Sequence, residues 1–462
     1  MDRRLFSRKL LTALGGSAFL PGILGVGRKG PLAYPGGKGP PGPPSARPPQ
    51  VSPRINGPRL NRWLAEFSRF GGREDGGVDR VAFSDADMEG RAWVLALLEE
   101  AGLDVTVDVA GNLLGRRPGS EVGLSPLMLG SHIDSVPAGG NYDGPLGSLG
   151  AIEVVRSLHE AGVKTRHPLV VVVFVNEEGG KTGSRILAGE FQARELELET
   201  ASGYTIGEGI RRLGGDPDRL AEARREVGDV AGYLELHVEQ GGILEGEEIT
   251  IGVVEGIVGI RRWTATVFGA ANHAGTTPMD QRRDALMGAA RLVEAVNRAV
   301  RDLPGSQVGT VGQIQARPGA PNVIPGEVVM SIELRALAME TIERVMERIR
   351  EEAEVIGREN GTPISIEEFY RSGAAPTDER FREWVEASAE DLLLSHRRMP
   401  SGAGHDAQSV AHFAPMGMIF IPSVGGLSHH PDEYSRPEDI EAGANVLLGA
   451  LLRADQGLDP GV

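Results

Sequence analysis

The stretch HPLVVVVFVNEEGG, residues 167–180, decides the fold. Its run Leu169–Val175 is almost wholly apolar, which is typical of a strand covered on both faces in a parallel sheet. Upstream, SPLMLGSHID (125–134) predicts another buried strand, and PLGSLGAIEVVRSLHEAG (145–162) predicts the helix between them. Strand, helix and strand in this order form a right-handed crossover unit, so the sequence indicates an α/β fold.

A segment with a different pattern of apolar and polar residues interrupts this α/β order. RRWTATVFGAANHAG (261–275) alternates as a half-exposed antiparallel strand does, and two amphipathic helices and further strands follow. This order predicts a smaller ferredoxin-like α+β domain over residues 252–367. It would be inserted into a catalytic domain with a mostly parallel mixed sheet flanked by helices, over residues 59–251 and 368–457.

The first 26 residues have a basic start followed by an apolar stretch broken by glycine and proline, as in a signal peptide. Arg3 and Arg4 resemble the pair of a twin-arginine export signal. We expect a signal over residues 1–26 and a disordered Pro/Gly linker over 27–58. The protein would then be exported, either periplasmic or tethered to the membrane by an uncleaved signal; it would be cytoplasmic if the signal is not functional.

Composition narrows the classes of function. The chain has 462 residues, which favours two domains, and a net charge of -16, which argues against a nucleic-acid partner. It has no cysteine, so a metal ion would have to be held by His, Asp and Glu. Such ligands suit zinc, manganese, cobalt or nickel.

Polar residues lie where the predicted strands end. His132 ends one strand, and Glu177 and Glu178 follow the next. Ligands bind at this edge of open α/β sheets. Two later stretches repeat the pattern: GYLELHVEQGG contains His237, and MGMIFIPSVGGLSHHPDE contains His429.

Asp143, on a glycine-rich loop, completes the set. Any one of these residues could belong to a turn without function, but several gathered at one edge would be costly without a cation. Three histidines and two carboxylates suit two metal ions that share a carboxylate, acidify a water and polarise a carbonyl. One of Glu177 and Glu178 would bind metal while the other acts as general base. Asp134 is placed to accept the second ring N–H of His132.

Seven motifs in order resemble one enzyme group over residues 61–454. They resemble the amidohydrolase subfamily of N-carbamoyl-L-amino acid hydrolase, allantoate amidohydrolase and β-ureidopropionase, within the two-metal aminoacylases and carboxypeptidases. The motifs are SHIDSVPAGGNYDG, NEEG, LELHVEQG, ANHAGTTPMDQRRDAL, NVIPGEV, SGAGHDAQ and GGLSHHPDE.

The resemblance implies roles for individual residues. Glu177 would be the catalytic base, and Asp143 would bridge two divalent ions. The remaining ligands would be His132 and His237 on one ion and Glu178 and His429 on the other. The inserted domain would be a dimerisation and lid domain of a homodimer, with His273 acting across the interface. The implied substrate contacts, to a small molecule with a carboxylate, are Gln240, His273, Asn322, Arg335, Gly404 and His405.

The resemblance implies hydrolysis of the linear ureido C–N bond of an N-carbamoyl-L-amino acid to the amino acid, CO2 and NH3. Allantoate amidohydrolase or 3-ureidopropionase activity is an alternative, as are aminoacylase or dipeptidase activity and a non-catalytic exported binding protein. Relatives commonly continue Glu-Glu-Gly with Ser-Arg-Phe and a longer loop. Here the stretch EEGGKTGSRILAG (177–189) is shorter and lacks that continuation. This difference leaves the identity of the substrate open, rather than the binding of metal.

Overall fold

The computed structural model describes residues 53–458, so the expected export signal and most of the expected linker lie outside the described residues. Helix α1 (Gly57–Phe67) includes the last two residues of that expected linker. It begins there because the side chain of Asn56 accepts a hydrogen bond from the backbone N–H of Arg59, and Pro58 suits the first turn of a helix.

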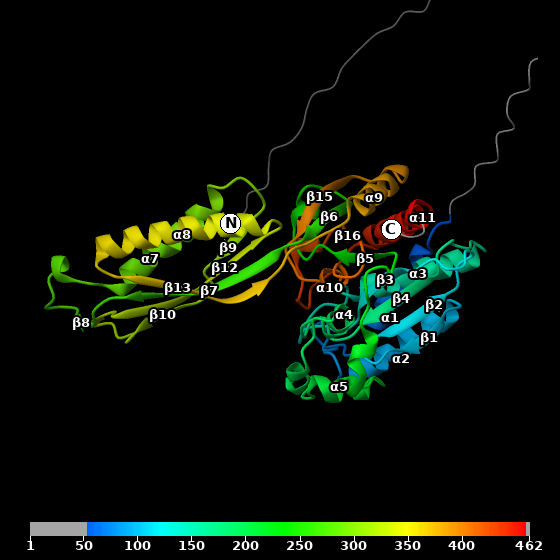
Figure 1. Cartoon of the computed structure of the whole chain (residues 1–462), viewed down its shortest axis with the longest axis horizontal. Helices are drawn as coiled ribbons and strands as arrows, with labels where there is room; N and C mark the ends of the chain where they lie inside the picture. The colour runs from blue at the N-terminus through cyan, green and yellow to red at the C-terminus, as the bar shows by residue number, and fades with distance from the viewer. Residues whose placement is uncertain (1–52, 459–462) are drawn as a thin grey trace, which may run out of the picture. The chain divides into compact units, whose positions relative to one another are not determined.

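A nine-stranded mixed sheet forms the centre of the larger part of the described chain (Figure 1). Strands β4, β3, β5 and β16 are neighbours and run parallel, whereas β1 and β2 extend the sheet as an antiparallel hairpin. The strands are β1 (Asp104–Val107), β2 (Leu113–Arg117), β3 (Leu127–His132), β4 (Leu169–Phe174), β5 (Gly232–Val238), β6 (Ile251–Ile257), β14 (Ala375–Pro376), β15 (His396–Ser401) and β16 (Met416–Ile421).

Both faces of this sheet are covered, as the apolar run at 169–175 predicts. Along β4, Val171 and Val173 belong to one core cluster, while Val170 and Val172 belong to a second. The first cluster includes residues of α1, α2 (Asp85–Glu100), α3 (Pro145–Glu160), α9 (Glu379–Asp391) and α11 (Pro437–Gly457). The second includes residues of α4 (Thr182–Ala188), α5 (Ile206–Arg212), the short α6 (Ile243–Gly246) and α10 (Asp406–Val410). The α/β class with a parallel centre is therefore confirmed.

A separate five-stranded antiparallel sheet carries two long helices. Its longest strands, β7 (Gly259–Phe268) and β12 (Glu327–Ala336), pair along their whole length and bury alternate residues. Trp263 lies in one buried cluster with residues of α7 (Ala285–Arg301) and α8 (Met339–Asn360), which lie side by side on this sheet (Figure 1). The other strands are β9 (Val308–Thr310), β10 (Ile314–Arg317) and β13 (Ile364–Ser372), and a two-residue pair, β8 (Asn272–His273) and β11 (Val323–Ile324), lies apart.

The limits of this second sheet differ from the expected insertion. Strand β6 begins one residue before the expected range 252–367 and otherwise lies within it, but it pairs with β15 and β16 of the larger sheet. At the other end, β13 extends the smaller sheet to Ser372. Local alternation predicts a strand, but it does not say which sheet the strand joins.

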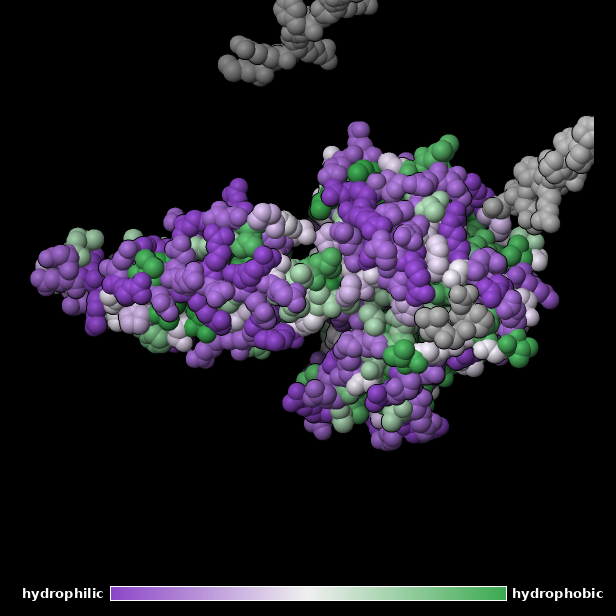
Figure 2. Space-filling model, turned by 45° about the horizontal axis from the view of Figure 1, so that its top comes forward, coloured by the Kyte–Doolittle hydropathy of each residue, from purple (hydrophilic) through white to green (hydrophobic). Residues whose placement is uncertain are grey.

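The surface drawn in Figure 2 is largely hydrophilic, with apolar residues scattered over it. Among residues 53–458, no helix combines the length and the apolar character that a bilayer span requires.

Candidate metal centre

Four parallel neighbouring strands deliver the candidate ligands to one edge. His132 is the last residue of β3, and Glu177 and Glu178 follow the end of β4. His237 is the penultimate residue of β5, and His429 follows β16. Because carboxyl ends of parallel strands meet at one edge, residues far apart in the sequence become neighbours.

Asp143 lies at the centre of this edge. Its Oδ1 is 3.6 Å from Nε2 of His132 and 3.2 Å from Nε2 of His237. Its Oδ2 is 3.4 Å from Nε2 of His429, which in turn lies 3.4 Å from Oε1 of Glu178. In each of the two resulting groups the ligand atoms lie within 4.8 Å of one another, and Asp143 belongs to both.

The two buried imidazoles are oriented as metal ligands usually are. Nδ1 of His132 lies 3.1 Å from the carbonyl oxygen of Asp134, and Nδ1 of His237 lies 2.9 Å from that of Val238. Hydrogen bonds of this kind fix the orientation of the ring, so that Nε2 faces Asp143 and could offer its lone pair to a cation held there. Nε2 of His237 is buried and makes no hydrogen bond within residues 53–458. A buried nitrogen that makes no hydrogen bond and lies 3.2 Å from the carboxylate of Asp143 fits a divalent cation.

Burial and charge act in opposite directions on the two central acids. Burial disfavours the ionised form of Asp143, but His237, His132 and His429 outweigh it and hold the pKa of this carboxyl well below its usual value. Burial raises the pKa of Glu177 well above its usual value, despite the nearby His132. The site therefore keeps one carboxylate ionised and gives the other a raised affinity for a proton.

Glu177 is a neighbour of the ligand groups and belongs to neither of them. It is buried, and its Oε2 lies 3.8 Å from Nε2 of His132. A carboxylate in this position can exchange protons with a molecule held between the two groups.

Asp134 holds the site in a different way from the one expected. Its backbone carbonyl is nearer to Nδ1 of His132, at 3.1 Å, than its carboxylate is, at 3.6 Å. Both carboxylate oxygens instead accept backbone N–H groups, one from Glu177 and one from Glu178, each at 3.2 Å. The carboxylate thus links the end of β3 to the turn that follows β4, while the backbone carbonyl contacts the ring of His132.

Glu433 supports the central carboxylate, and sequence reasoning missed it. Its Oε1 accepts the backbone N–H groups of Tyr142 and Asp143 at 2.8 and 2.9 Å. The hydroxyl of Ser428 lies 2.8 Å from Oε2 of Glu433 and 2.8 Å from Oδ2 of Asp143. The only signal in the sequence was a carboxylate in GGLSHHPDE, a motif we interpreted for its histidine.

Three of the expected substrate contacts lie at or beside the ligand groups. Gln240 donates from Nε2 to Oδ2 of Asp143 at 2.5 Å. The ring of His405 lies 4.5 Å from that of His237, and its Nε2 lies 2.8 Å from the hydroxyl of Ser401. Gly404 precedes His405, so the loop reaches the same edge.

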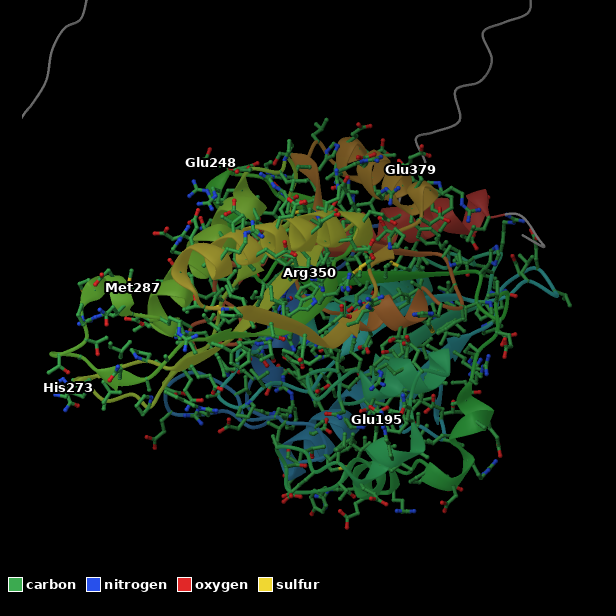
Figure 3. The ribbon with its side chains drawn as sticks, turned by 60° about the vertical axis from the view of Figure 1, so that its left-hand side comes forward. Glu195, Glu248, His273, Met287, Arg350 and Glu379 are labelled. Atoms are coloured by element: carbon green, nitrogen blue, oxygen red, sulfur yellow. The ribbon has the colours of Figure 1, made fainter. Side chains whose placement is uncertain are left out.

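The expected contacts from the smaller sheet lie elsewhere. Arg335 on β12 donates to the carbonyl of Gly402 at 2.7 Å and to Glu333 at 2.8 Å, so it reaches the loop that carries Gly404. His273 is exposed at the outer end of its segment (Figure 3). Nδ1 of His273 accepts from its own turn, and its strand pairs with the one that follows Asn322. Within residues 53–458, neither His273 nor Asn322 contacts the ligands around Asp143.

An α/β sheet that gathers imidazoles around a shared carboxylate at its carboxyl edge defines a metal-dependent hydrolase. The chain belongs to peptidase family M20/M25/M40, whose model matches residues 128–453.

Comparison with known proteins gives relatives that match this chain over nearly their whole length. The chain is 39% identical to an N-carbamoyl-L-amino acid amidohydrolase of Geobacillus stearothermophilus, over 87% of this chain and 100% of the relative. It is 33% identical to an allantoate amidohydrolase of Bacillus subtilis, over 85% and 95%. A crystal structure of an amidase of the hydantoinase/carbamoylase family from Burkholderia multivorans is 39% identical, with a TM-score of 0.81 over 87% of this chain and 99% of that one.

Proposed function

We propose that this protein is a metal-dependent amidohydrolase that cleaves the ureido C–N bond of N-carbamoyl-L-amino acids. The observation that carries the proposal is the two-sided environment of Asp143, whose oxygens face separate groups of ligands. The similarity to carbamoyl amino acid amidohydrolases over most of the chain supports the substrate class.

The proposed cofactor is a pair of divalent ions, zinc, manganese, cobalt or nickel, bridged by Asp143. The five proposed ligands are His132, Asp143, Glu178, His237 and His429. Such ions make water more acidic and polarise a carbonyl oxygen. The protein would supply the rest of the chemistry through its own side chains.

Glu177 is the proposed general base. Its raised pKa suits a group that must take up a proton and then release it. We propose that its carboxylate accepts the proton of the attacking water and passes it to the leaving nitrogen. The bond between the carbamoyl carbon and the nitrogen of the amino acid breaks, which releases the amino acid and carbamic acid, and carbamic acid then breaks down to CO2 and NH3.

The substrate carboxylate is proposed to bind Arg335 and Asn322. A guanidinium offers paired donors to a carboxylate, and Asn322 lies in the same exposed segment as His273. Gln240, Gly404 and His405 would line the same pocket. The exposed position of His273 fits the proposal that it completes the site of a second subunit. The smaller sheet and its helices would then be the ferredoxin-like dimerisation and lid domain.

The deciding experiment is a substrate panel on the metal-loaded protein. We expect release of amino acid from N-carbamoyl-L-amino acids to exceed turnover of allantoate, 3-ureidopropionate and N-acetyl amino acids. A preference for allantoate or 3-ureidopropionate would move the assignment within the ureido-cleaving group. Turnover of acyl or peptide substrates alone would make the protein an aminoacylase or dipeptidase, and absence of both turnover and bound metal would indicate a binding protein.

Export is a separate proposal, which rests on the arginine pair in the first residues. Fractionation of cells that produce the full chain should place the protein outside the cytoplasm. Replacing Arg3 and Arg4 by lysine should keep the protein in the cytoplasm.

A further inference from the structure

A tight turn after the proposed base brings a lysine to the metal centre. Lys181 follows Glu177 by four residues, and its backbone N–H donates to the carbonyl of Glu177 at 2.8 Å. Lys181 itself has a φ of 57°, in the left-handed region. The turn therefore keeps Lys181 beside the end of β4, where the ligand groups lie. No step of the proposed reaction uses this residue.

The ammonium of Lys181 lies against the loop that carries two of the proposed substrate contacts, Gly404 and His405. A Cβ atom built on Gly404 would lie 3.6 Å from Nζ of Lys181. The same nitrogen donates to Oε1 of Gln408, which lies three residues beyond His405. The ammonium therefore borders the proposed substrate pocket.

Gln408 holds this ammonium in place. Its Nε2 donates to the carbonyl of Gly373 at 2.7 Å and to the hydroxyl of Ser372 at 3.3 Å. Because the amide nitrogen is used in this way, the amide oxygen is left to accept from Lys181. Gln408 is itself buried, so the end of a flexible lysine side chain is held at one position.

No acidic side chain compensates the charge of Lys181. Within residues 53–458 this ammonium forms no ion pair, and its one hydrogen-bond partner is the neutral amide of Gln408. An ammonium has three donors, so two of them remain for a ligand. Lys181 is partly buried, which strengthens its attraction for an anion. The ammonium is therefore available to an anionic group of a bound substrate.

The strand register relates this ammonium to Arg335. Arg335 of β12 and Ser372 of β13 are both paired with Ile260 of β7. Side chains of residues that are paired across neighbouring strands lie on one face of a sheet, so Arg335 and Ser372 share a face. Their Cα atoms are two strand spacings apart, which is about 10 Å. The residue that contacts Gln408 thus lies close to the proposed carboxylate-binding arginine.

The two cations meet the same loop. Arg335 donates to the carbonyl of Gly402, and Lys181 donates to Gln408 six residues further on. The α-carboxylate of the substrate is proposed to bind Arg335, which places the amino acid part of the substrate beside this loop. The side chain of that amino acid is therefore the group that can reach Lys181.

We propose that Lys181 is a specificity residue that binds a carboxylate on the side chain of the substrate. The enzyme then prefers N-carbamoyl-L-amino acids with an acidic side chain. The inference rests on the proposed function, because it uses the same metal centre and the same site at Arg335. Lys181 binds the substrate and takes no part in breaking the C–N bond.

The first test compares N-carbamoyl-L-glutamate with N-carbamoyl-L-glutamine on the metal-loaded wild-type protein. The two substrates have nearly the same size and shape, and they differ in the charge of the side chain. A hydrogen bond to a charged group commonly stabilises a complex enough for a tenfold effect, so kcat/KM should favour glutamate by at least about tenfold. Equal values, or a preference for glutamine, would overturn the role of Lys181.

The second test removes the charge. Lys181→Met should bring the ratio of kcat/KM for the glutamate substrate to that for the glutamine substrate close to one, mainly through a higher KM for glutamate. Lys181→Arg keeps the charge and should retain most of the preference. Lys164→Met is the matched control, because Lys164 is the other lysine of residues 53–458 and is exposed. It removes the same net charge and should leave the ratio unchanged.

Two results with these variants would contradict the proposal. An unchanged ratio in Lys181→Met would show that the ammonium does not read the side chain. An equal fall in kcat for both substrates would show that Lys181 acts in the reaction instead of in the choice of substrate.

The two proposals fail in different ways. Turnover of carbamoyl substrates without a preference for glutamate would reject the role of Lys181 and leave the proposed function intact. A preference for N-acetyl-L-glutamate over N-acetyl-L-glutamine that is lost in Lys181→Met, without carbamoyl turnover, would reject the proposed function and leave the role of Lys181 intact. Turnover of neither series by the metal-loaded protein would overturn both.

Discussion

Glu433 accepts the backbone N–H of Asp143 at 2.9 Å, although the two residues are 290 positions apart in the sequence. This bond fixes the loop that carries the carboxylate shared by both ligand groups. Outer hydrogen bonds of this kind commonly contribute about 10- to 100-fold to metal affinity.

We therefore expect Glu433→Gln to weaken metal binding about 10- to 100-fold. The amide retains one acceptor but loses the charge and one of the two carboxylate oxygens. Competition with a chelator, followed by metal analysis, measures the change. Asp432→Asn is the control, because Asp432 is exposed beside it and should bind metal as the wild type does. Unchanged affinity in Glu433→Gln would remove its supporting role.

Glu177→Gln should lower kcat about 10²- to 10⁴-fold, the usual contribution of a general base. Metal content should remain that of the wild type, because Glu177 belongs to neither ligand group. Glu178→Gln provides the contrast, since it should lose metal as well as activity. Substantial turnover by metal-loaded Glu177→Gln would refute the assigned role.

The pH profile should follow the protonation of Glu177. Its pKa is raised, first of all by burial, and only the deprotonated carboxylate can accept a proton. The active form is therefore present above this pKa, and kcat/KM should fall as the pH drops through it. A profile that stays level until the ordinary range of a glutamate would contradict the assignment. Initial rates over a pH series with one carbamoyl substrate measure it.

Asp406 offers a test of stability. Burial, with the charge of Glu235, raises the pKa of this acid to about 8, and its Oδ2 has no hydrogen bond within residues 53–458. The folded state holds the proton more tightly than the unfolded state, whose value is near 3.8. The stability that this proton contributes is complete below that value and is lost as the pH rises toward 8.

Asp406→Asn removes this dependence. The free energy of unfolding of the metal-free variant, minus that of the metal-free wild type, should grow by at most about 1.4 kcal/mol per pH unit between these limits. Urea unfolding at several pH values measures it. Asp280→Asn, at an exposed position, should show no such growth. Parallel curves for Asp406→Asn and the wild type would show that the buried acid titrates normally.

Arg335→Lys should raise KM about 10- to 100-fold for a carbamoyl amino acid, because an ammonium cannot offer the paired donors of a guanidinium. Arg317→Lys, an exposed arginine on β10, is the control and should leave KM unchanged. Steady-state kinetics on both variants measures the change in KM. A fall in kcat alone would point to a structural role of Arg335 through Glu333 and Gly402.

The sequence predicted the parts of this site that depend on strand ends. An apolar run marks where a strand stops, and parallel neighbours place those ends together, which is why His132, Glu177 and His237 could be expected at one edge. Glu433 could not be found in this way, because its role depends on a turn that reaches backbone N–H groups from a distant segment. The place of β6 in the larger sheet could not be read from the sequence for a similar reason, because its partners β15 and β16 come from distant segments.

The backbone carbonyl of Asp134 is a further case. Residue spacing suggested that its side chain would meet Nδ1 of His132, whereas its backbone carbonyl lies nearer to that nitrogen. Spacing predicts which residues are near one another, but the choice between a carboxylate and a carbonyl depends on local dihedral angles.

The distribution of the ligands along the chain has a consequence for biosynthesis. The first four proposed ligands lie between His132 and His237 and the fifth, His429, follows β16, so a growing polypeptide carries four of the five long before the last is translated. A complete pair of binding positions can form only after most of the polypeptide has been translated. A message that stops before the codon of His429 would yield a product with the complete first group of donors and a second group that lacks its histidine.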